Sequence, residues 1–310
     1  MDVRKLGTSE LRVSSIGLGC VTFGREIDSA TAFAVLDHAV DRGIQLLDTA
    51  AIYGDGASET VLGRWLSSRK RRGQIVLATK VSNQLAREAV RESVDASLRR
   101  LQTDYIDLLQ AHSWDPRTPL EETLRAFEEL VQAGKVRYVG CSNWQACHIE
   151  SGLEIQRSRD WAPLVSVQPM YNLVDRGIED ALLPLCAERQ VGVISYSPLG
   201  AGFLTGKYRS GGDVPAGTRF DVIPGHQKIY FTERGFRVVE RLRQIAAASG
   251  HSMVKLAIGW TLQRPGITSV LIGARRRAHV DQAFEAEKWA ASDDAPAWLE
   301  RLTAASDVNT

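Results

Sequence analysis

The sequence predicts a parallel α/β fold, and within that class a closed (β/α)8 barrel in preference to an open, doubly wound sheet. Eight short apolar runs alternate along the chain with segments of helical periodicity, and strands that are joined by helices pair in parallel. An open sheet predicts a Gly-x-Gly-x-x-Gly turn after its first strand. Gly17 and Gly19 match the first two positions of that turn, but Thr22 replaces the third glycine, so the closed barrel is favoured.

The elements follow in a regular order after a short N-terminal hairpin. Residues 2–6 and 10–14 are expected to form the two strands of this hairpin, around a turn at 7–9. The strands of the main sheet are expected near residues 15–19, 44–48, 75–80, 105–110, 136–142, 164–169, 191–196 and 269–273. Helices are expected between them, among others at residues 31–42, 59–67, 86–101, 120–133 and 177–189.

One long segment, residues 196–232, breaks this alternation because glycine and proline recur throughout it. A loop of this length inside a folded domain is usually functional or mobile. It follows a strand end on the face where such folds bind ligands. We therefore interpret it as a flap over a ligand, with a mobile surface excursion as the alternative. The whole chain, 1–310, is expected to form one domain with a helical tail at about 290–310.

The composition argues against several classes of partner. The 310 residues are 44% hydrophobic and 24% charged with a formal net charge of +1, so nothing points to nucleic acid or to an anionic membrane. The four cysteines, Cys20, Cys141, Cys147 and Cys186, follow no metal-ligand spacing, and we expect reduced thiols and no metal. No signal-peptide pattern and no membrane-spanning apolar run is present. These features predict a cytoplasmic protein and leave its oligomeric state open.

Four polar residues stand at or just after the ends of strand-like runs. Asp48 and Lys80 end two of the runs, His112 follows a third, and Tyr53 lies five residues after Asp48 in a glycine-flanked turn. Because side chains at the carboxyl ends of parallel strands meet on one face, we expect the four to converge. Each alone has a structural interpretation, such as a cap, a surface cation or a packed loop residue. Together their complementary chemistry points to an enzyme.

This set of side chains is suited to moving a proton to the oxygen atom of a carbonyl group. A free tyrosine has a pKa of about 10, so it needs help from a positive charge to donate a proton at neutral pH. Lys80 would stabilise the phenolate of Tyr53, and Asp48 would keep Lys80 charged. His112 would hydrogen-bond the carbonyl oxygen. We therefore expect carbonyl reduction, in which a cofactor gives hydride to carbon and Tyr53 gives a proton to oxygen.

Six segments resemble the aldo-keto reductase superfamily, and they run in order over almost the whole chain. They are residues 47–54, 78–80, 110–112, 134–143, 168–172 and 196–200. The resemblance implies a (β/α)8 barrel whose base is plugged by the N-terminal hairpin. It also implies a catalytic tetrad of Asp48, Tyr53, Lys80 and His112, acting on an aldehyde or ketone with NAD(P)H.

The same resemblance implies which residues bind the cofactor. Ser142, Asn143 and Gln168 would hydrogen-bond the nicotinamide carboxamide, and Tyr196 would stack on its ring. Glycines would let the backbone approach the pyrophosphate, and a lysine would add a point charge. Asp48, the end of the first barrel strand and the segment along the pyrophosphate supply the remaining contacts: Gly19, Cys20, Val21, Ser197, Pro198, Leu199, Gly200, Gly202 and Lys207.

The adenosine end departs from the family pattern. Gly273, Arg275, Arg276, His279 and Gln282 would lie there. Relatives usually carry glutamine at position 279 and an acidic residue followed by asparagine, or a similar pair, at positions 282 and 283, where this chain has Gln282 and Ala283. The adenine contacts are therefore expected to be altered. Arg275 and Arg276 could form charge-assisted hydrogen bonds to a 2′-phosphate, so NADP(H) is favoured over NAD(H).

The substrate side is expected to be aromatic. Phe23, Trp114 and Trp144 would form a wall beside Tyr53 and His112, which suits many aldehydes and ketones. The leading hypothesis is thus an NAD(P)H-dependent reductase of a small carbonyl compound. Two alternatives keep the same cofactor site: a dehydrogenase of a sugar or secondary alcohol, and a slow-turnover NADPH-binding subunit that senses redox state.

Overall fold

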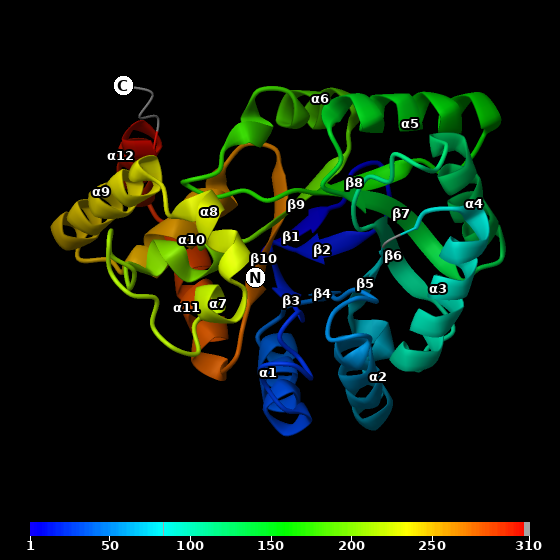
Figure 1. The fold of residues 1–310 in the computed structure, drawn as a ribbon, viewed down its shortest axis with the longest axis horizontal. Helices are drawn as coiled ribbons and strands as arrows, with labels where there is room; N and C mark the ends of the chain where they lie inside the picture. Colours follow the sequence, from blue (N-terminus) through cyan, green and yellow to red (C-terminus); the bar gives the residue numbers. More distant parts are fainter. Residues whose placement is uncertain (83, 307–310) are drawn as a thin grey trace.

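Eight parallel strands close into a barrel in the computed structural model, which describes residues 1–82 and 84–306. The strand order around the barrel is β10-β3-β4-β5-β6-β7-β8-β9, and helices surround it (Figure 1). The predicted fold class is therefore confirmed, and each predicted strand is found within two residues of its expected ends. The strands are β3 (Ile16–Gly19), β4 (Leu46–Asp48), β5 (Val76–Val81), β6 (Ile106–Ala111), β7 (Val136–Ser142), β8 (Leu164–Gln168), β9 (Gly192–Tyr196) and β10 (Ile267–Gly273).

The helices form the outer layer because each buries one apolar face against the barrel. In α4, for example, Leu124, Phe127 and Leu130 are buried at helical spacing. Gly134 follows that helix with φ +70°, the left-handed conformation expected of a C′ glycine. The main helices are α1 (Ser29–Asp41), α2 (Ala57–Arg69), α3 (Arg87–Leu101), α4 (Leu120–Gln132), α5 (Ala146–Arg159), α6 (Leu182–Arg189), α9 (Glu233–Ser249), α10 (Met253–Gln263), α11 (Arg277–Ala290) and α12 (Ala295–Ser306).

One predicted helix, 177–189, is wrong at its beginning. The chain forms a single 3-10 turn at Gly177–Glu179 and starts α6 only at Leu182. Pro184 explains the difference, because a proline inside a helix clashes with the carbonyl group four residues earlier. Starting α6 at Leu182 places Pro184 in the first turn, where it is tolerated.

The N-terminal hairpin closes one end of the barrel, as expected. Its strands β1 (Val3–Lys5) and β2 (Arg12–Ser14) pair antiparallel, and Figure 1 shows them inside the ring of barrel strands. Leu6, Leu11 and Val13 pack against apolar side chains from the barrel interior. The turn at Gly7 is so close to β8 that a Cβ there would lie 2.3 Å from the carbonyl oxygen of Val165.

The segment 197–232 is folded rather than a loose excursion. It contains a 3-10 helix at Gly200–Thr205 and the short helices α7 (Arg219–Val222) and α8 (Gln227–Tyr230). Its aromatic side chains form a compact cluster of their own, with ring centroids 5.0–6.5 Å apart: Phe203, Tyr208, Phe220, Tyr230 and Phe231.

The C-terminal part of the described chain is helical. Helix α12 lies beside α9 at one edge of the molecule (Figure 1). Trp260 of α10 donates a hydrogen bond from its indole nitrogen to Thr303 of α12, at 3.0 Å. Over residues 1–82 and 84–306, no helix has both the length and the apolar character that crossing a membrane requires.

Candidate active site

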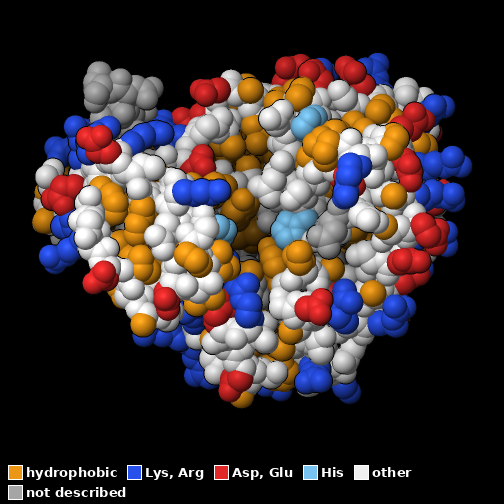
Figure 2. All heavy atoms as spheres, viewed as in Figure 1, with side chains coloured by type: hydrophobic (Ala, Val, Ile, Leu, Met, Phe, Trp, Pro, Cys, Tyr) orange, Lys and Arg blue, Asp and Glu red, His pale blue; other side chains and the backbone are white. Residues whose placement is uncertain are grey.

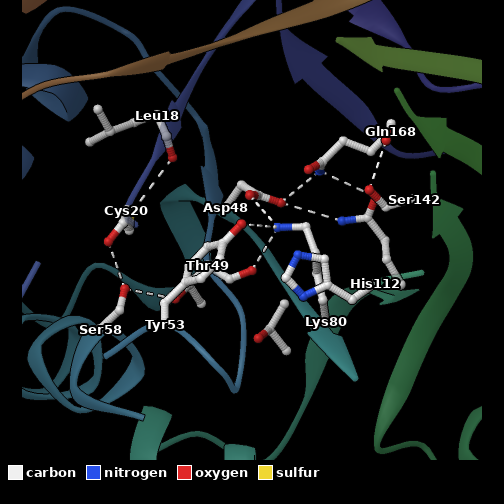
Figure 3. A network of polar contacts seen from close by, with 12 residues as sticks. Leu18, Cys20, Asp48, Thr49, Tyr53, Ser58, Lys80, His112, Ser142 and Gln168 are labelled. Carbon is white, nitrogen blue, oxygen red and sulfur yellow. Dashed lines mark hydrogen bonds and ion pairs between the residues drawn. The ribbon is translucent and has the colours of Figure 1, made fainter. Parts of the chain in front are cut away.

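The barrel brings two charged side chains from neighbouring strands into contact at its centre. Asp48 is the last residue of β4 and Lys80 lies near the end of β5. These strands pair in parallel with Asp48 opposite Ala78. Lys80 lies two residues after Ala78, and its side chain turns back toward Asp48. The Lys80 Nζ atom lies 2.5 Å from Asp48 Oδ2, and both side chains are almost completely buried. Figure 3 shows this pair at the middle of a network of polar contacts.

The ammonium group of Lys80 has a partner for each of its three N–H bonds. Besides Asp48, it donates to the carbonyl oxygen of Thr49 at 2.9 Å and to the hydroxyl oxygen of Tyr53 at 3.4 Å. Burial opposes a charged lysine, but the negative charge of Asp48 and the partnership with Tyr53 outweigh it and raise the pKa of Lys80. Lys80 is therefore a fixed positive charge directed at the tyrosine oxygen.

Asp48 is held on its other side by two amides. Its Oδ1 accepts hydrogen bonds from Gln168 Nε2 at 2.9 Å and from Gln110 Nε2 at 3.3 Å. Gln110 was not among the predicted site residues. It lies in β6, two residues before His112, and alternation along that strand turns both side chains inward. That alternation is the one sequence signal that could have identified it.

A tight turn presents Tyr53 to this pair. The three residues after it, Gly54, Asp55 and Gly56, all have positive φ, which reverses the chain into α2. Ser58, in the first turn of α2, is completely buried and donates a hydrogen bond to the carbonyl oxygen of Cys20 at 2.7 Å. The turn that carries Tyr53 is thus anchored to the end of β3.

Two opposing influences act on the Tyr53 hydroxyl. Burial is the larger and raises the pKa of Tyr53, while the charge of Lys80 lowers it. The net effect is a raised pKa of Tyr53, because the lowering by Lys80 is smaller than the effect of burial. Tyr53 therefore carries its proton at neutral pH and has a cation beside it to stabilise the phenolate.

His112 completes the group of four. Its backbone N–H donates to the carbonyl oxygen of Val81 at 2.9 Å, and its ring meets that of Tyr53 edge-on with centroids 5.6 Å apart. Its Nδ1 lies 2.8 Å from the hydroxyl oxygen of Ser82. Burial and the positive charge of Lys80 lower the pKa of His112 to about 4, so the ring is neutral at physiological pH.

These four residues differ in their access to solvent. Lys80 and Asp48 are buried, while Tyr53 and His112 are partly exposed in front of them. Figure 2 shows a hollow at the middle of the molecule in this view, with hydrophobic and histidine atoms along its edge. The structure therefore brings the predicted tetrad together, with the charge pair buried and Tyr53 and His112 nearer to solvent.

The residues expected around the nicotinamide are linked to His112. Tyr196, at the end of β9, donates from its hydroxyl group to Asn143 Oδ1 at 2.9 Å. Asn143 Nδ2 in turn donates to the carbonyl oxygen of His112 at 3.1 Å. Ser142 donates to the backbone oxygen of Gln168 at 2.7 Å. These contacts place Ser142, Asn143, Gln168 and Tyr196 side by side along one edge of the tetrad.

The segment expected along a pyrophosphate has an unusual backbone. Ser197, Gly200, Ala201 and Gly202 all take positive φ, so consecutive peptide groups can turn toward the same side. A Cβ at Gly202 would lie 3.4 Å from Lys207 Nζ, so that ammonium group reaches this backbone. Asn172, another residue not predicted, supports the segment by donating to the carbonyl oxygen of Ser197 at 3.1 Å. Pro198 and Leu199 lie within the same stretch.

Positive charge gathers at the expected adenosine end. Burial and the charges of Arg276, Arg275 and Lys207 lower the pKa of His279. The Arg275 backbone N–H and the Arg276 Nε lie 3.3 Å and 3.1 Å from its two ring nitrogens. A neutral imidazole accepts at only one nitrogen, so only one of these contacts is a hydrogen bond at a time. Gly273 and Gln282 are exposed nearby on β10 and α11.

The segment 197–232 is fastened on the same side. Arg219 pairs with Glu26 at 3.2 Å, which ties α7 to the loop after β3. Arg275 Nη1 donates to the carbonyl oxygen of Gly217 at 3.2 Å. The expected flap is therefore connected both to the end of β3 and to the end of β10.

The end of β3 can contact a ligand with backbone atoms more than with side chains. Gly19 ends the strand, Cys20 is completely buried, and Val21 is partly exposed. Burial and the nearby charge of Asp48 raise the pKa of Cys20, so its thiol stays protonated and is no nucleophile. Any contact of Cys20 with a ligand would be made by its backbone.

The expected aromatic wall is only partly exposed. Phe23 is completely buried in the main hydrophobic core and does not line the hollow in this structure. Trp144 is also buried and meets Trp114 edge-on, with ring centroids 5.1 Å apart. Trp114 is partly exposed and stacks on His148 at 3.8 Å. Among residues 1–82 and 84–306, no three His, Cys, Asp or Glu side chains gather as a metal ion would require.

Comparisons with known proteins place the barrel in a family. The model of the Aldo/keto reductase family matches residues 15–303. The chain is 36% identical over 303 residues to the aldo-keto reductase YhdN of Bacillus subtilis, covering 93% of this chain and 89% of the relative. It is 35% identical over 294 residues to the uncharacterized oxidoreductase YrpG of the same organism, covering 89% and 87%. It is 33% identical over 300 residues to a probable voltage-gated potassium channel subunit beta of Oryza sativa, covering 92% and 91%.

Proposed function

Because the chain belongs to the aldo/keto reductase family, we propose that it reduces an aldehyde or ketone to the alcohol with NADPH and that Tyr53 donates the proton. Family membership makes it an oxidoreductase of carbonyl compounds; the cofactor and the proton donor are our assignments. One observation carries the assignment of the proton donor: the Lys80 ammonium is buried on Asp48 and lies 3.4 Å from the Tyr53 oxygen.

The four side chains then have separate tasks. Tyr53 gives its proton to the carbonyl oxygen, and Lys80 stabilises the phenolate that remains. Asp48 keeps Lys80 charged and fixed, since a buried ammonium without a partner would lose its proton. The His112 ring lies edge-on to that of Tyr53, with centroids 5.6 Å apart, and it would hydrogen-bond the carbonyl oxygen and so hold that oxygen beside the hydroxyl group.

The residues along the barrel rim fit a nicotinamide dinucleotide. The amides of Asn143 and Gln168 match a carboxamide, and the ring of Tyr196 is partly exposed beside them. The backbone at 197–202 and Lys207 suit a pyrophosphate. When bound, the nicotinamide supplies the hydride that is added to the carbonyl carbon. This arrangement supports the proposal that the chain binds a nicotinamide dinucleotide.

The first test is turnover. Purified protein mixed with NADPH and a panel of aromatic, aliphatic and sugar-derived carbonyl compounds should consume NADPH, as followed by absorbance. Tyr53→Phe should reduce kcat by about 10²–10⁴-fold, the range for loss of a positioned general acid, while binding NADPH as before. Tyr105→Phe is the matched control and should keep full activity, because Tyr105 directly precedes β6 whereas His112 follows the other end of that strand. Near-normal kcat in Tyr53→Phe would reject the proton-donor role.

The preference for NADPH has its own test. Arg275, Arg276 and Lys207 together surround His279 with positive charge, which favours a 2′-phosphate there. Arg276→Ala should therefore lower kcat/KM with NADPH by roughly tenfold and leave kcat/KM with NADH unchanged. Arg277→Ala, at an exposed position beginning α11, is the control. A wild-type protein that prefers NADH would overturn the preference.

The other two hypotheses become outcomes of the same experiment. Oxidation of an alcohol uses the identical site in reverse, and turnover with NADP+ and alcohols but with no carbonyl compound would favour it. Tight NADPH binding without turnover in either direction would favour a redox-sensing subunit. Three relatives are named as probable or putative voltage-gated potassium channel subunits beta, and these names are the reason to test this last hypothesis.

A further inference from the structure

Ser82 occupies a position that the register of the barrel places beside His112. Strands β5 and β6 pair in parallel up to Val81 opposite Ala111. One step further, the His112 backbone N–H donates to the carbonyl oxygen of Val81 at 2.9 Å, so Ser82 comes opposite His112. Side chains alternate along a strand, and both residues therefore point to the same face as Lys80. The Ser82 Oγ atom lies 2.8 Å from His112 Nδ1.

The tautomer of His112 matters because its ring is neutral. A neutral imidazole has one N–H and one lone pair, so it offers a ligand either a donor or an acceptor at Nε2. A carbonyl oxygen only accepts hydrogen bonds. His112 can therefore hold a carbonyl substrate only if its proton is on Nε2, and the partner of Nδ1 decides which tautomer is stable.

We propose that Ser82 is a positioning residue that stabilises one tautomer of His112: its hydroxyl group donates to Nδ1 of the ring whose proton is on Nε2, and so keeps that proton available to the substrate oxygen. The function of this tautomer rests on the proposed carbonyl reduction. The hydrogen bond between Ser82 and His112 does not depend on that proposed reaction, because it is present without a substrate. The Nε2–H form is also the more stable one of a histidine side chain in water, so the Ser82 hydroxyl reinforces an existing preference.

A serine hydroxyl group can donate to Nδ1, as the ring with its proton on Nε2 requires. The same hydroxyl group could accept from Nδ1 in the other tautomer, so Ser82 strengthens the tautomer that the ring already prefers and does not choose it alone. A carboxylate at this position would only accept and would force the proton onto Nδ1. It would also raise the pKa of His112, whereas the neutral hydroxyl leaves the ring uncharged beside Lys80.

The test uses two variants of Ser82 and one control. Ser82→Ala removes the hydroxyl group, and Ser82→Thr keeps it. Ser113→Ala makes the same change at the exposed residue that directly follows His112 in the chain. The 15N chemical shifts of the His112 ring report which nitrogen carries the proton, and they are measured on the free protein without substrate or cofactor.

We expect the proton on Nε2 in the wild-type protein and in Ser82→Thr, and a mixture of tautomers in Ser82→Ala. For carbonyl reduction, Ser82→Ala should lower kcat roughly tenfold, the effect of one hydrogen bond, with little change in KM for NADPH. Ser82→Thr and Ser113→Ala should keep wild-type kcat. A merely structural role for Ser82 would change stability without moving the ring shifts.

Two results would overturn the proposal. One is a wild-type His112 with its proton on Nδ1; the other is a Ser82→Ala variant with unchanged ring shifts and unchanged kcat. If the wild-type protein reduced no carbonyl compound but the shifts changed as expected, the proposed function would fail while the assignment of Ser82 to the His112 tautomer would stand. The two proposals are thus tested separately.

Discussion

At the scale of single residues, the surroundings of Lys80 decide what the site can do. A lysine that is 1% exposed is costly to bury unless its charge is paired. Here Asp48, the Thr49 carbonyl and Tyr53 take up its three N–H bonds. The position of the charge is therefore fixed by burial as well as by attraction, and its effect on Tyr53 can be predicted.

Replacing Lys80 by methionine should change the pH dependence of catalysis as well as its rate. Without the ammonium group, burial acts unopposed and the pKa of Tyr53 rises further. The basic limb of the pH–kcat profile for reduction should move to higher pH, and kcat should fall by about 10²–10⁴-fold. Lys70→Met, at an exposed position after α2, should change neither. A basic limb that stays in place would show that Lys80 does not act on Tyr53.

His112 predicts a pH dependence of stability. The pKa of its ring is about 4 in the folded protein, because of burial and Lys80, against an ordinary value of 6.5. As pH falls from 6.5 toward 4, the unfolded chain binds a proton that the folded protein does not. The free energy of unfolding therefore falls over this window. Melting temperatures measured across it should decline less steeply in His112→Gln than in the wild-type protein; equal slopes would contradict the shift.

At the scale of elements, α2 links the turn of Tyr53 to the layer of helices. Glu59 is completely buried in its first turn, where it accepts hydrogen bonds from Thr79 of β5 at 2.6 Å and from Arg100 of α3 at 2.7 Å. Thr79 precedes Lys80 and its side chain points outward from the barrel. The same strand thus presents Lys80 to the site and Thr79 to α2.

The contact between α2 and α3 depends on a glycine. A Cβ added at Gly63 would lie 2.2 Å from the carbonyl oxygen of Arg100, so the helices would have to move apart. Gly63→Ala should lower the free energy of unfolding by about 1–3 kcal/mol, as overpacking does. Gly73→Ala, where nothing lies within 4 Å, is the control and should have little effect. Urea denaturation of both variants measures the difference, and equal stabilities would contradict this account of the packing.

At the scale of the whole molecule, the barrel has two ends with separate roles. One end carries the tetrad, and the other is closed by the hairpin and its own hydrophobic cluster. Substitutions at the tetrad end should therefore change activity, whereas substitutions at the hairpin end should change stability.

Leu6 tests the role of the hairpin. Its side chain is completely buried and reaches so close to β9 that a Cβ at Gly192 would lie 2.5 Å from Leu6 Cδ1. Leu6→Ala should lower the free energy of unfolding by about 2–5 kcal/mol, with kcat per folded molecule unchanged. Arg12→Ala, at an exposed position of β2, is the control. Loss of activity without loss of stability would mean that the hairpin also shapes the site.

Most of the fold could be predicted from the sequence because its signals are local. Apolar runs of strand length and amphipathic helical segments can be recognised one at a time, and their alternation alone implies a parallel sheet. The start of α6 could not be placed by periodicity, since Pro184 interrupts a pattern that otherwise continues. The positions of Asp48, Lys80 and His112 on the barrel were predictable for the same local reason: each lies at or next to the end of a strand.

The tertiary structure decided which side chains touch. Gln110 contacts Asp48, and Ser82 contacts His112, because of the register between neighbouring strands, which no short stretch of sequence specifies. Phe23 is buried in the core although its position suggested a pocket wall, because exposure depends on packing that no short stretch of sequence specifies. Distances between strands are set by closure of the whole barrel, and the chemistry of the site depends on those distances.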